Sequence, residues 1–153
     1  MSTQPQNGAM PVLAGWLGFA GLLPQVGVIA VLLAGPPGWR TAALAIGLGY
    51  AGLILSFIGG LWWGMAAAAR AVPNWVHVVA VVPSLWALAA VSSVALGGST
   101  TTSFIIVGVG LVATLAIDRA LAGLGICPSW WMALRVPLSS GLGALTLLAA
   151  VIG

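Results

Sequence analysis

Long apolar runs separated by short polar or glycine- and proline-rich breaks dominate the chain. A helix needs about 20 mostly apolar residues to cross a bilayer, because the hydrocarbon layer is roughly 30 Å thick and each residue adds about 1.5 Å. Five runs reach that length, and we expect each to form a membrane-spanning helix. Their expected bounds are residues 12–34, 41–69, 75–96, 101–122 and 130–152.

These runs are continuous rather than alternating, and they are too long for the strands of a membrane barrel. The sequence therefore predicts an all-α fold, a polytopic membrane helix bundle with five transmembrane helices, built as a single domain by residues 12–153. Residues 1–11 are predicted to form a disordered polar tail. Because the tail has no Lys or Arg and the next run exceeds the apolar region of a signal peptide, we expect that run to be retained.

Charge is almost absent: 3% of the 153 residues are charged and 61% are hydrophobic. A soluble domain carries about a quarter of its residues as charged side chains, so the composition excludes a soluble globular enzyme and a disordered chain. The isoelectric point near 10.7 reflects the lack of acids, because the four arginines are scattered rather than clustered. We therefore expect the lipid bilayer as a partner and no nucleic acid.

The arginines predict an orientation, because short cytoplasmic loops are enriched in basic residues. With five crossings, Arg70, Arg119 and Arg135 lie on the side of the N-terminus, and Arg40 lies on the opposite side. The sequence therefore predicts a cytoplasmic N-terminus and a C-terminus outside.

The second predicted helix carries a small residue at every fourth position. The members of this stripe are Gly52, Ser56, Gly60, Gly64 and Ala68. Small residues let helix backbones approach closely in lipid, where apolar side chains gain little by association. We expect the stripe to be the central packing face of the bundle; the alternative is a homodimer face.

Polar and helix-disturbing residues recur near the middle of the predicted membrane. Pro24 and Pro83 each remove a backbone hydrogen bond, and Gln25, Ser56 and Ser84 lie at similar depth. One interpretation is that these polar side chains only satisfy one another. The other is a small aromatic-walled pocket, whose candidate residues are Gln25, Ser56, Trp62, Trp63, Ser84 and Trp86.

Asp118 is the single acid of the chain and lies near the inner end of the fourth predicted helix. An unpaired carboxylate there is costly, so we expect it to be paired, hydrogen-bonded or protonated. The adjacent Arg119 points about 100° away around the helix. Arg135 begins the fifth helix at matching depth, and an Asp118–Arg135 structural ion pair is the preferred interpretation. The rival hypothesis makes Asp118 a proton-coupling residue.

Catalytic and metal chemistry has few candidates here. The chain holds one His, one acid and one Cys, at His77, Asp118 and Cys127. No serine–histidine pair, carboxylate pair or histidine cluster can be assembled from them. We expect no catalytic residue, no metal site and no evident cofactor, and hence no enzyme.

Several motifs together resemble a known family. They are Tyr50–Gly64, Pro83–Trp86, Asp118–Arg119 and Pro128–Leu138. The most specific parts are Leu-Ser-Phe-Ile-Gly-Gly at 55–60 and Trp-x-x-x-Leu-Arg-x-Pro-Leu at 130–138. From about residue 13 to the C-terminus, the chain is similar to the bacterial and mitochondrial proteins related to transmembrane protein 69, the domain of unknown function 3429. It departs from the pattern at Trp62-Trp63, where one Trp after a variable or basic residue is expected.

The resemblance implies about five membrane helices in a bacterial or mitochondrial inner membrane, and it implies no activity. Of these two membranes, we expect the bacterial inner membrane, with the protein spanning it several times. The preferred function is a non-enzymatic protein that binds a hydrophobic small molecule or serves as an accessory of a larger membrane complex. The alternative is a small secondary transporter with Asp118 as its coupling residue.

Overall fold

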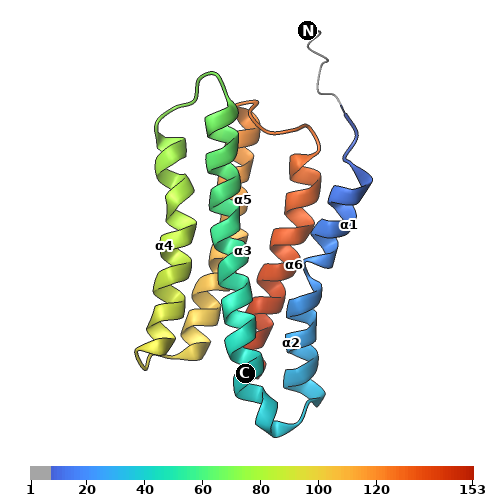
Figure 1. Ribbon diagram of the computed structural model, residues 1–153, viewed down its shortest axis with the longest axis vertical. Helices are drawn as coiled ribbons and strands as arrows, with labels where there is room; N and C mark the ends of the chain where they lie inside the picture. The colour runs from blue at the N-terminus through green and yellow to red at the C-terminus, as the bar shows by residue number, and fades with distance from the viewer. Residues whose placement is uncertain (1–7) are drawn as a thin grey trace.

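The computed structural model describes residues 8–153, in which the regular secondary structure is helical (Figure 1). The elements in chain order are α1 (Val12–Ala20), α2 (Leu23–Ala34), the short 3₁₀ helix η1 (Pro37–Trp39), α3 (Arg40–Ala68), α4 (Trp75–Ala95), α5 (Thr100–Gly123) and α6 (Trp131–Ile152). Of the predicted polar tail, residues 1–7 lie outside the described residues, and 8–11 form no regular structure.

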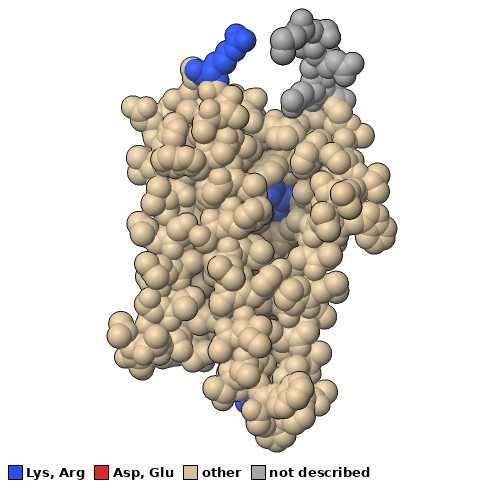
Figure 2. Space-filling view, in the orientation of Figure 1, with Lys and Arg blue, Asp and Glu red and all other residues tan. Residues whose placement is uncertain are grey.

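The predicted all-helical architecture is confirmed. Within residues 8–153, five helical segments are long and apolar enough to cross a membrane, with α1 and α2 together forming the first. The surface of these segments carries large exposed apolar side chains, such as Leu53, Leu85 and Val151, and uncharged residues cover the body of the molecule in Figure 2. Such a surface is stable in lipid and not in water. The protein is an integral, multi-pass membrane protein.

The first span is broken near its middle, between α1 and α2. Pro24 has no N–H to donate, and its ring collides with the carbonyl four residues earlier, at Ala20, where α1 ends. The chain turns at Gly21 and Leu22 before helical geometry resumes. The hydroxyl of Tyr50 in α3 donates a hydrogen bond to the Gly21 carbonyl oxygen, so part of the polarity freed by the break is satisfied by a neighbouring helix.

The helices form an antiparallel bundle with clearly separated ends (Figure 1). The start of α1, the α3–α4 connection and the α5–α6 connection lie at one end, and the α2–α3 connection, the α4–α5 connection and the C-terminus lie at the other. The α5 helix supplies much of the core, since Phe104, Val107, Leu111 and Leu121 are completely buried. The tightest partnerships are α3 with α4 and α5 with α6.

Arg40 fastens the C-terminal end of the bundle. Its guanidinium donates to the carbonyl oxygens of Ile152 and Gly153 at the end of α6, and to that of Leu32 in α2. These carbonyls include groups that have no intrahelical partner at a helix C-terminus, and a cation is favourable beside them. The contact joins the beginning of α3 to the ends of α2 and α6.

The predicted packing stripe on α3 is correct at one end and wrong at the other. Gly52 is buried against α4, and Ser56 is partly buried, but Gly60, Gly64 and Ala68 are exposed. Each step of four residues advances about 40° beyond a full turn of an α-helix, so a strict fourfold spacing winds away from the bundle. The buried face instead follows mixed steps of three and four residues through Ala51, Leu55, Ile58, Trp62 and Ala66.

Gly59, next to the exposed Gly60, is a point of close approach between α3 and α4. A Cβ atom at Gly59 would lie 2.4 Å from the Ala80 carbonyl oxygen, a backbone atom of α4, whereas a Cβ at Gly60 would meet nothing within 4 Å. The ring of Pro83 lies beside the same point, 3.3 Å from that Cβ position. The absence of a side chain at Gly59 therefore sets the α3–α4 distance.

We expect Gly59→Ala to force α3 and α4 apart and to lower the free energy of unfolding by about 1–3 kcal/mol, the usual cost of overpacking a filled interface. The matched control is Gly60→Ala, which should leave stability within about 0.5 kcal/mol. Thermal and denaturant unfolding in mild detergent, followed by circular dichroism, measures both. Equal effects of the two substitutions would contradict this assignment of the packing face.

Candidate functional site

Asp118 lies at the centre of a buried polar cluster near the end of the bundle where α5 meets α6. Its side chain is completely buried. Oδ1 accepts hydrogen bonds from the indole Nε1–H of Trp62 at 2.8 Å and from that of Trp131 at 2.9 Å. Oδ2 accepts from Nε of Arg135 at 2.8 Å. The carboxylate thus receives three donors, from α3 and α6, while standing on α5.

Arg135 completes this cluster through further contacts. Its Nη2 donates to the hydroxyl of Thr114 at 3.2 Å, and that hydroxyl donates in turn to the Leu111 carbonyl oxygen at 2.6 Å. The guanidinium carbon lies 5.8 Å from the ring centroid of Trp131, at a distance that permits a cation–π contact. The polar cluster is therefore Trp62, Thr114, Asp118, Trp131 and Arg135.

The polar cluster is electrically neutral, and each of the three donors to its carboxylate points at an oxygen atom. A single ion in hydrocarbon is strongly disfavoured, and an ion pair is tolerated when good geometry and additional hydrogen bonds offset its desolvation. Here the carboxylate and the guanidinium balance each other at 2.8 Å, and two indole N–H groups satisfy the remaining carboxylate oxygen. The ion pair expected from the sequence has this geometry. Arg119, the sequence neighbour of Asp118, is exposed.

Local sequence spacing accounts for most of the polar cluster. Thr114 and Asp118 are four residues apart on α5, and Trp131 and Arg135 are four apart on α6, so each pair shares one helix face. The α5–α6 connection of residues 124–130 turns at Gly125, whose positive φ of 71° suits glycine. Sequence reasoning missed Thr114 and the donor roles of Trp62 and Trp131. The spacing of four residues from Asp118 indicates Thr114, and the same spacing from Arg135 indicates Trp131. No local pattern indicates that Trp62 contacts Asp118.

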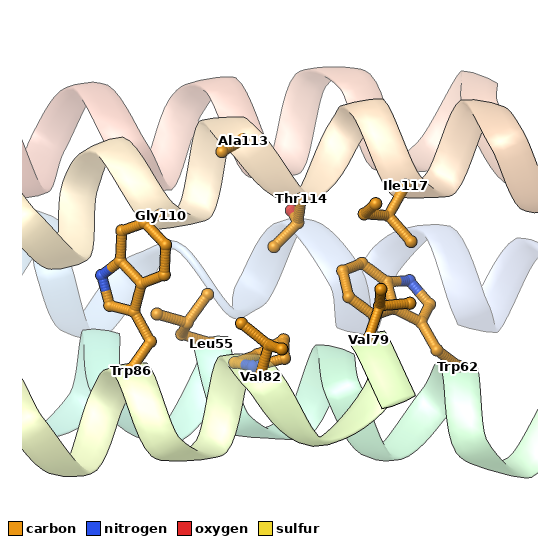
Figure 3. A pocket seen from close by; sticks show the side chains of 10 residues that line it. Leu55, Trp62, Val79, Val82, Trp86, Gly110, Ala113, Thr114 and Ile117 are labelled. Carbon is orange, nitrogen blue, oxygen red and sulfur yellow. The ribbon is translucent and has the colours of Figure 1, made fainter. Parts of the chain in front are cut away.

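An apolar pocket of about 140 Å³ lies beside the polar cluster, between α3, α4 and α5. Figure 3 shows the indoles of Trp62 and Trp86 at its two ends, with Leu55 and Val82 between them. Its lining residues are Leu55, Trp62, Val79, Val82, Pro83, Trp86, Gly110, Ala113, Thr114 and Ile117. Trp62 and Thr114 belong to both the pocket and the polar cluster, so one wall of the pocket is held by the ion pair.

The pocket differs from the one expected from the sequence. Trp62 and Trp86 line it, but Gln25, Ser56, Trp63 and Ser84 do not. Successive residues on a helix diverge by about 100°. Because Trp62 faces inward, Trp63 is half exposed and packs in an edge-to-face arrangement with the ring of His77 instead. The position that departs from the family pattern thus separates into one buried and one exposed indole.

The mid-membrane polar residues also divide into two groups. The hydroxyls of Ser56 and Ser84 lie 2.8 Å apart and are hydrogen-bonded across α3 and α4. Gln25 does not join them: it is completely buried, and both polar atoms of its side chain lack a partner within residues 8–153. Gln25 stands on α2, whose main neighbours are α3 and α6, whereas the Ser56–Ser84 pair lies between α3 and α4.

Cys127 lies in the α5–α6 connection, outside the membrane-spanning segments. Burial of its thiol, together with the negative charge of Asp118, raises the cysteine pKa to about 11. Since the thiolate is the reactive form, this thiol is a weak nucleophile at neutral pH. Its environment is that of a structural cysteine.

Comparison with known proteins identifies the family. The profile of the family described as protein of unknown function (DUF3429) matches residues 10–151. The chain belongs to the DUF3429 family. It is also 36% identical over 133 residues to transmembrane protein 69 of Xenopus tropicalis, an alignment that covers 84% of this chain and 50% of that protein. The chain therefore spans about half the length of this curated relative. No solved structure matches the chain.

The DUF3429 match includes every residue of the polar cluster and of the pocket. The resemblance expected from the sequence is confirmed at the level of the family. No activity accompanies the family description, so the chemistry of the site must be inferred from its geometry.

For this DUF3429 protein, we expect Arg135→Ala to lower the free energy of unfolding by about 3–5 kcal/mol, because it leaves the Asp118 carboxylate buried without its counter-ion. Adding Asp118→Asn should restore part of the loss, since the neutral amide is cheaper to bury. Arg119→Ala is the matched control and should have little effect, because Arg119 is exposed. Unfolding in mild detergent gives the free energy of unfolding of the wild-type protein, the two single variants and the double variant. A double variant no more stable than Arg135→Ala would contradict the ion pair.

Proposed function

We propose that this protein is a non-enzymatic binding protein of the membrane, which holds a hydrophobic small molecule in the pocket between α3, α4 and α5. The observation that carries the proposal is the pocket itself: an apolar space of about 140 Å³ with an indole at either end. In a bilayer, close helix packing is the main source of association between helices. A pocket kept open between three helices is therefore a feature that needs an occupant.

The size of the pocket favours one ring or a short stretch of chain. A cavity of roughly 150 Å³ in a protein core accommodates a benzene-sized molecule. The pocket continues along the crevice between α4 and α5 into a depression of about 430 Å³, with which it shares Val82 and Trp86. This continuity suits a ligand that places a compact apolar end inside and extends a flexible tail toward the lipid.

The walls of the pocket favour selective rather than indifferent binding. Trp86 is fixed by a hydrogen bond of 3.0 Å from its Nε1 to the Ile106 carbonyl oxygen of α5, and Trp62 is fixed by Asp118. Pro83 has no N–H for the Val79 carbonyl four residues earlier, and both residues line the pocket. The two rigid indoles define the shape of the pocket. The Val79 carbonyl, which lacks its usual amide donor, offers a ligand one hydrogen-bond acceptor.

Transport is the weaker alternative. A coupling carboxylate must be reached by the ion or proton that it couples, but Asp118 is completely buried, receives three hydrogen bonds and is paired with Arg135. The described residues supply no second acid to exchange with. This supports a structural role for Asp118 and a binding function for the bundle.

We further propose that the membrane is a bacterial inner membrane and that the end holding the start of α1 faces the cytoplasm. The support is the arginine distribution: Arg70, Arg119 and Arg135 belong toward this end, and Arg40 belongs to the opposite end. The family resemblance is compatible with that membrane. The proposal includes the case in which the protein is an accessory subunit of a larger membrane complex.

Filling the pocket tests the binding function. We expect the protein purified in mild detergent to carry a hydrophobic small molecule, detected by native mass spectrometry and identified after extraction. Ala113→Phe places a ring in the pocket and should reduce the bound molecule about tenfold or more, the equivalent of 1.4 kcal/mol. Ala116→Phe is the matched control on the exposed side of α5, outside the pocket lining. An empty wild-type protein, or equal occupancy in both variants, would refute the proposal.

Orientation can be tested at the two ends of α4. In a Cys127→Ser background, Leu96→Cys and Asn74→Cys each add one exposed thiol, at opposite ends of that helix. With a cytoplasmic N-terminus, a membrane-impermeant maleimide added to intact bacterial spheroplasts should label the Leu96→Cys variant and spare the Asn74→Cys variant. The reversed labelling pattern would show the opposite topology.

A further inference from the structure

The guanidinium of Arg135 has donors left over after it has satisfied the polar cluster. An arginine carries five N–H groups, and Arg135 uses Nε for Asp118 and Nη2 for Thr114. Its Nη1, with two N–H groups, has no acceptor within residues 8–153. Nη1 is also not among the fully enclosed side-chain atoms that lack a partner there, so part of its surface remains accessible.

A recess in the surface leads to this arginine. Figure 2 shows a hollow between α3 on one side and α6 with α1 on the other, and a basic group lies at its floor. Arg135 is the arginine that α6 carries, and 8% of its side-chain surface remains accessible. The recess differs from the apolar pocket, whose lining comes from α3, α4 and α5.

The loose attachment of α1 leaves this recess open to lipid. Within α1 only Gly15 is buried, while Val12, Trp16 and Leu17 are largely exposed. The helix contacts α6 through Gly18, where a Cβ would lie 2.9 Å from the Leu138 side chain. A ligand can therefore enter from the bilayer, between α1 and α3, without unpacking the core.

The depth of Arg135 decides what such a ligand must offer. Arg135 follows the first residue of α6 by four positions, or about 6 Å along the helix axis. Since α6 is a candidate membrane span, donors at this level face the uppermost acyl chains rather than bulk water, and a donor without an acceptor there is unfavourable. The occupant of the recess must therefore carry a hydrogen-bond acceptor on a body that is soluble in lipid.

The charge of the cluster selects among acceptors. Asp118 already neutralises Arg135 at 2.8 Å, so an anion entering the recess would be attracted by one charge and repelled by the other. A neutral carbonyl oxygen accepts from Nη1 without that repulsion. The aromatic ring of Trp131, which lies against the guanidinium, keeps its plane fixed and its free edge directed.

We propose that the recess between α3, α6 and α1 binds the carbonyl oxygen of a neutral membrane amphiphile, held by Nη1 of Arg135. Two membrane components supply this chemistry, the ester carbonyl of a phospholipid and the ring carbonyl of an isoprenoid quinone. This second site would lie on the opposite side of the polar cluster from the apolar pocket. Both sites share the same buried support, since Arg135 is oriented by Asp118 and Thr114.

Solid-state NMR of the full chain in lipid nanodiscs tests this site without altering Arg135. The protein is labelled with ¹⁵N-arginine, and Arg40→Lys, Arg70→Lys and Arg119→Lys assign the other signals by their loss. One bilayer contains an ester-linked phosphatidylcholine with ¹³C-labelled carbonyls. A second contains an ether-linked phosphatidylcholine with decylubiquinone ¹³C-labelled at its ring carbonyls. A third contains the ether-linked lipid alone as background.

We expect the Arg135 Nη1 signal to be dephased by ¹³C about fivefold or more above background in the first or the second bilayer, as for a carbonyl oxygen roughly 2.9 Å from nitrogen. Dephasing in the first identifies the phospholipid ester, and dephasing in the second identifies the quinone. Arg119, which is exposed, should show neither. Magnetisation transfer to Arg135 Nη1 from water alone, or from lipid phosphorus, would overturn the proposal.

Discussion

The burial of one carboxylate in lipid is the constraint on which the rest of this bundle depends. Asp118 has no contact with solvent, and three donors from two other helices surround its two oxygens. Each donor is directional, so the carboxylate fixes the rotation of α6 about its axis and the height of Trp62 on α3. A bundle of nearly uniform apolar helices otherwise has few features that distinguish one packing from another. The polar cluster supplies that distinction.

The two candidate sites follow from how the helices share their packing. The tight partnerships of α3 with α4 and of α5 with α6 leave seams between the pairs. The apolar pocket lies in the seam between α4 and α5, and the recess lies in the seam between α3 and α6. Trp62, Thr114 and Arg135 line these seams and also contact Asp118 or one another. A ligand in either seam would therefore contact residues whose positions are fixed by the Asp118–Arg135 ion pair.

The sequence predicted the architecture well because the bilayer restricts the choices. An apolar run of the right length, bounded by Gly, Pro or Arg, can only be a spanning helix, and the pairing of Asp118 with Arg135 follows from one acid and one basic residue at matching depth. Rotational detail was harder to predict. The fourfold stripe from Gly52 to Ala68 suggests a single face although its spacing drifts around the helix, and the pair Trp62-Trp63 does not indicate which indole faces inward. Which of two adjacent residues faces inward depends on contacts between distant segments, such as Trp62 with Asp118, and no local pattern encodes them.

The short connection between α5 and α6 has a consequence for how the chain is made. Residues 124–130 separate the two helices, so Asp118 leaves the ribosome before the arginine that neutralises it. A lone aspartate costs about 2.5–3.5 kcal/mol at the centre of a spanning helix on translocon-insertion scales, and less at the depth of Asp118, near the end of α5. The ion pair with Arg135 offsets this cost only once α6 is also in the membrane, so we expect α5 and α6 to leave the translocon together as a hairpin. Insertion of α5 is thereby coupled to the synthesis of α6.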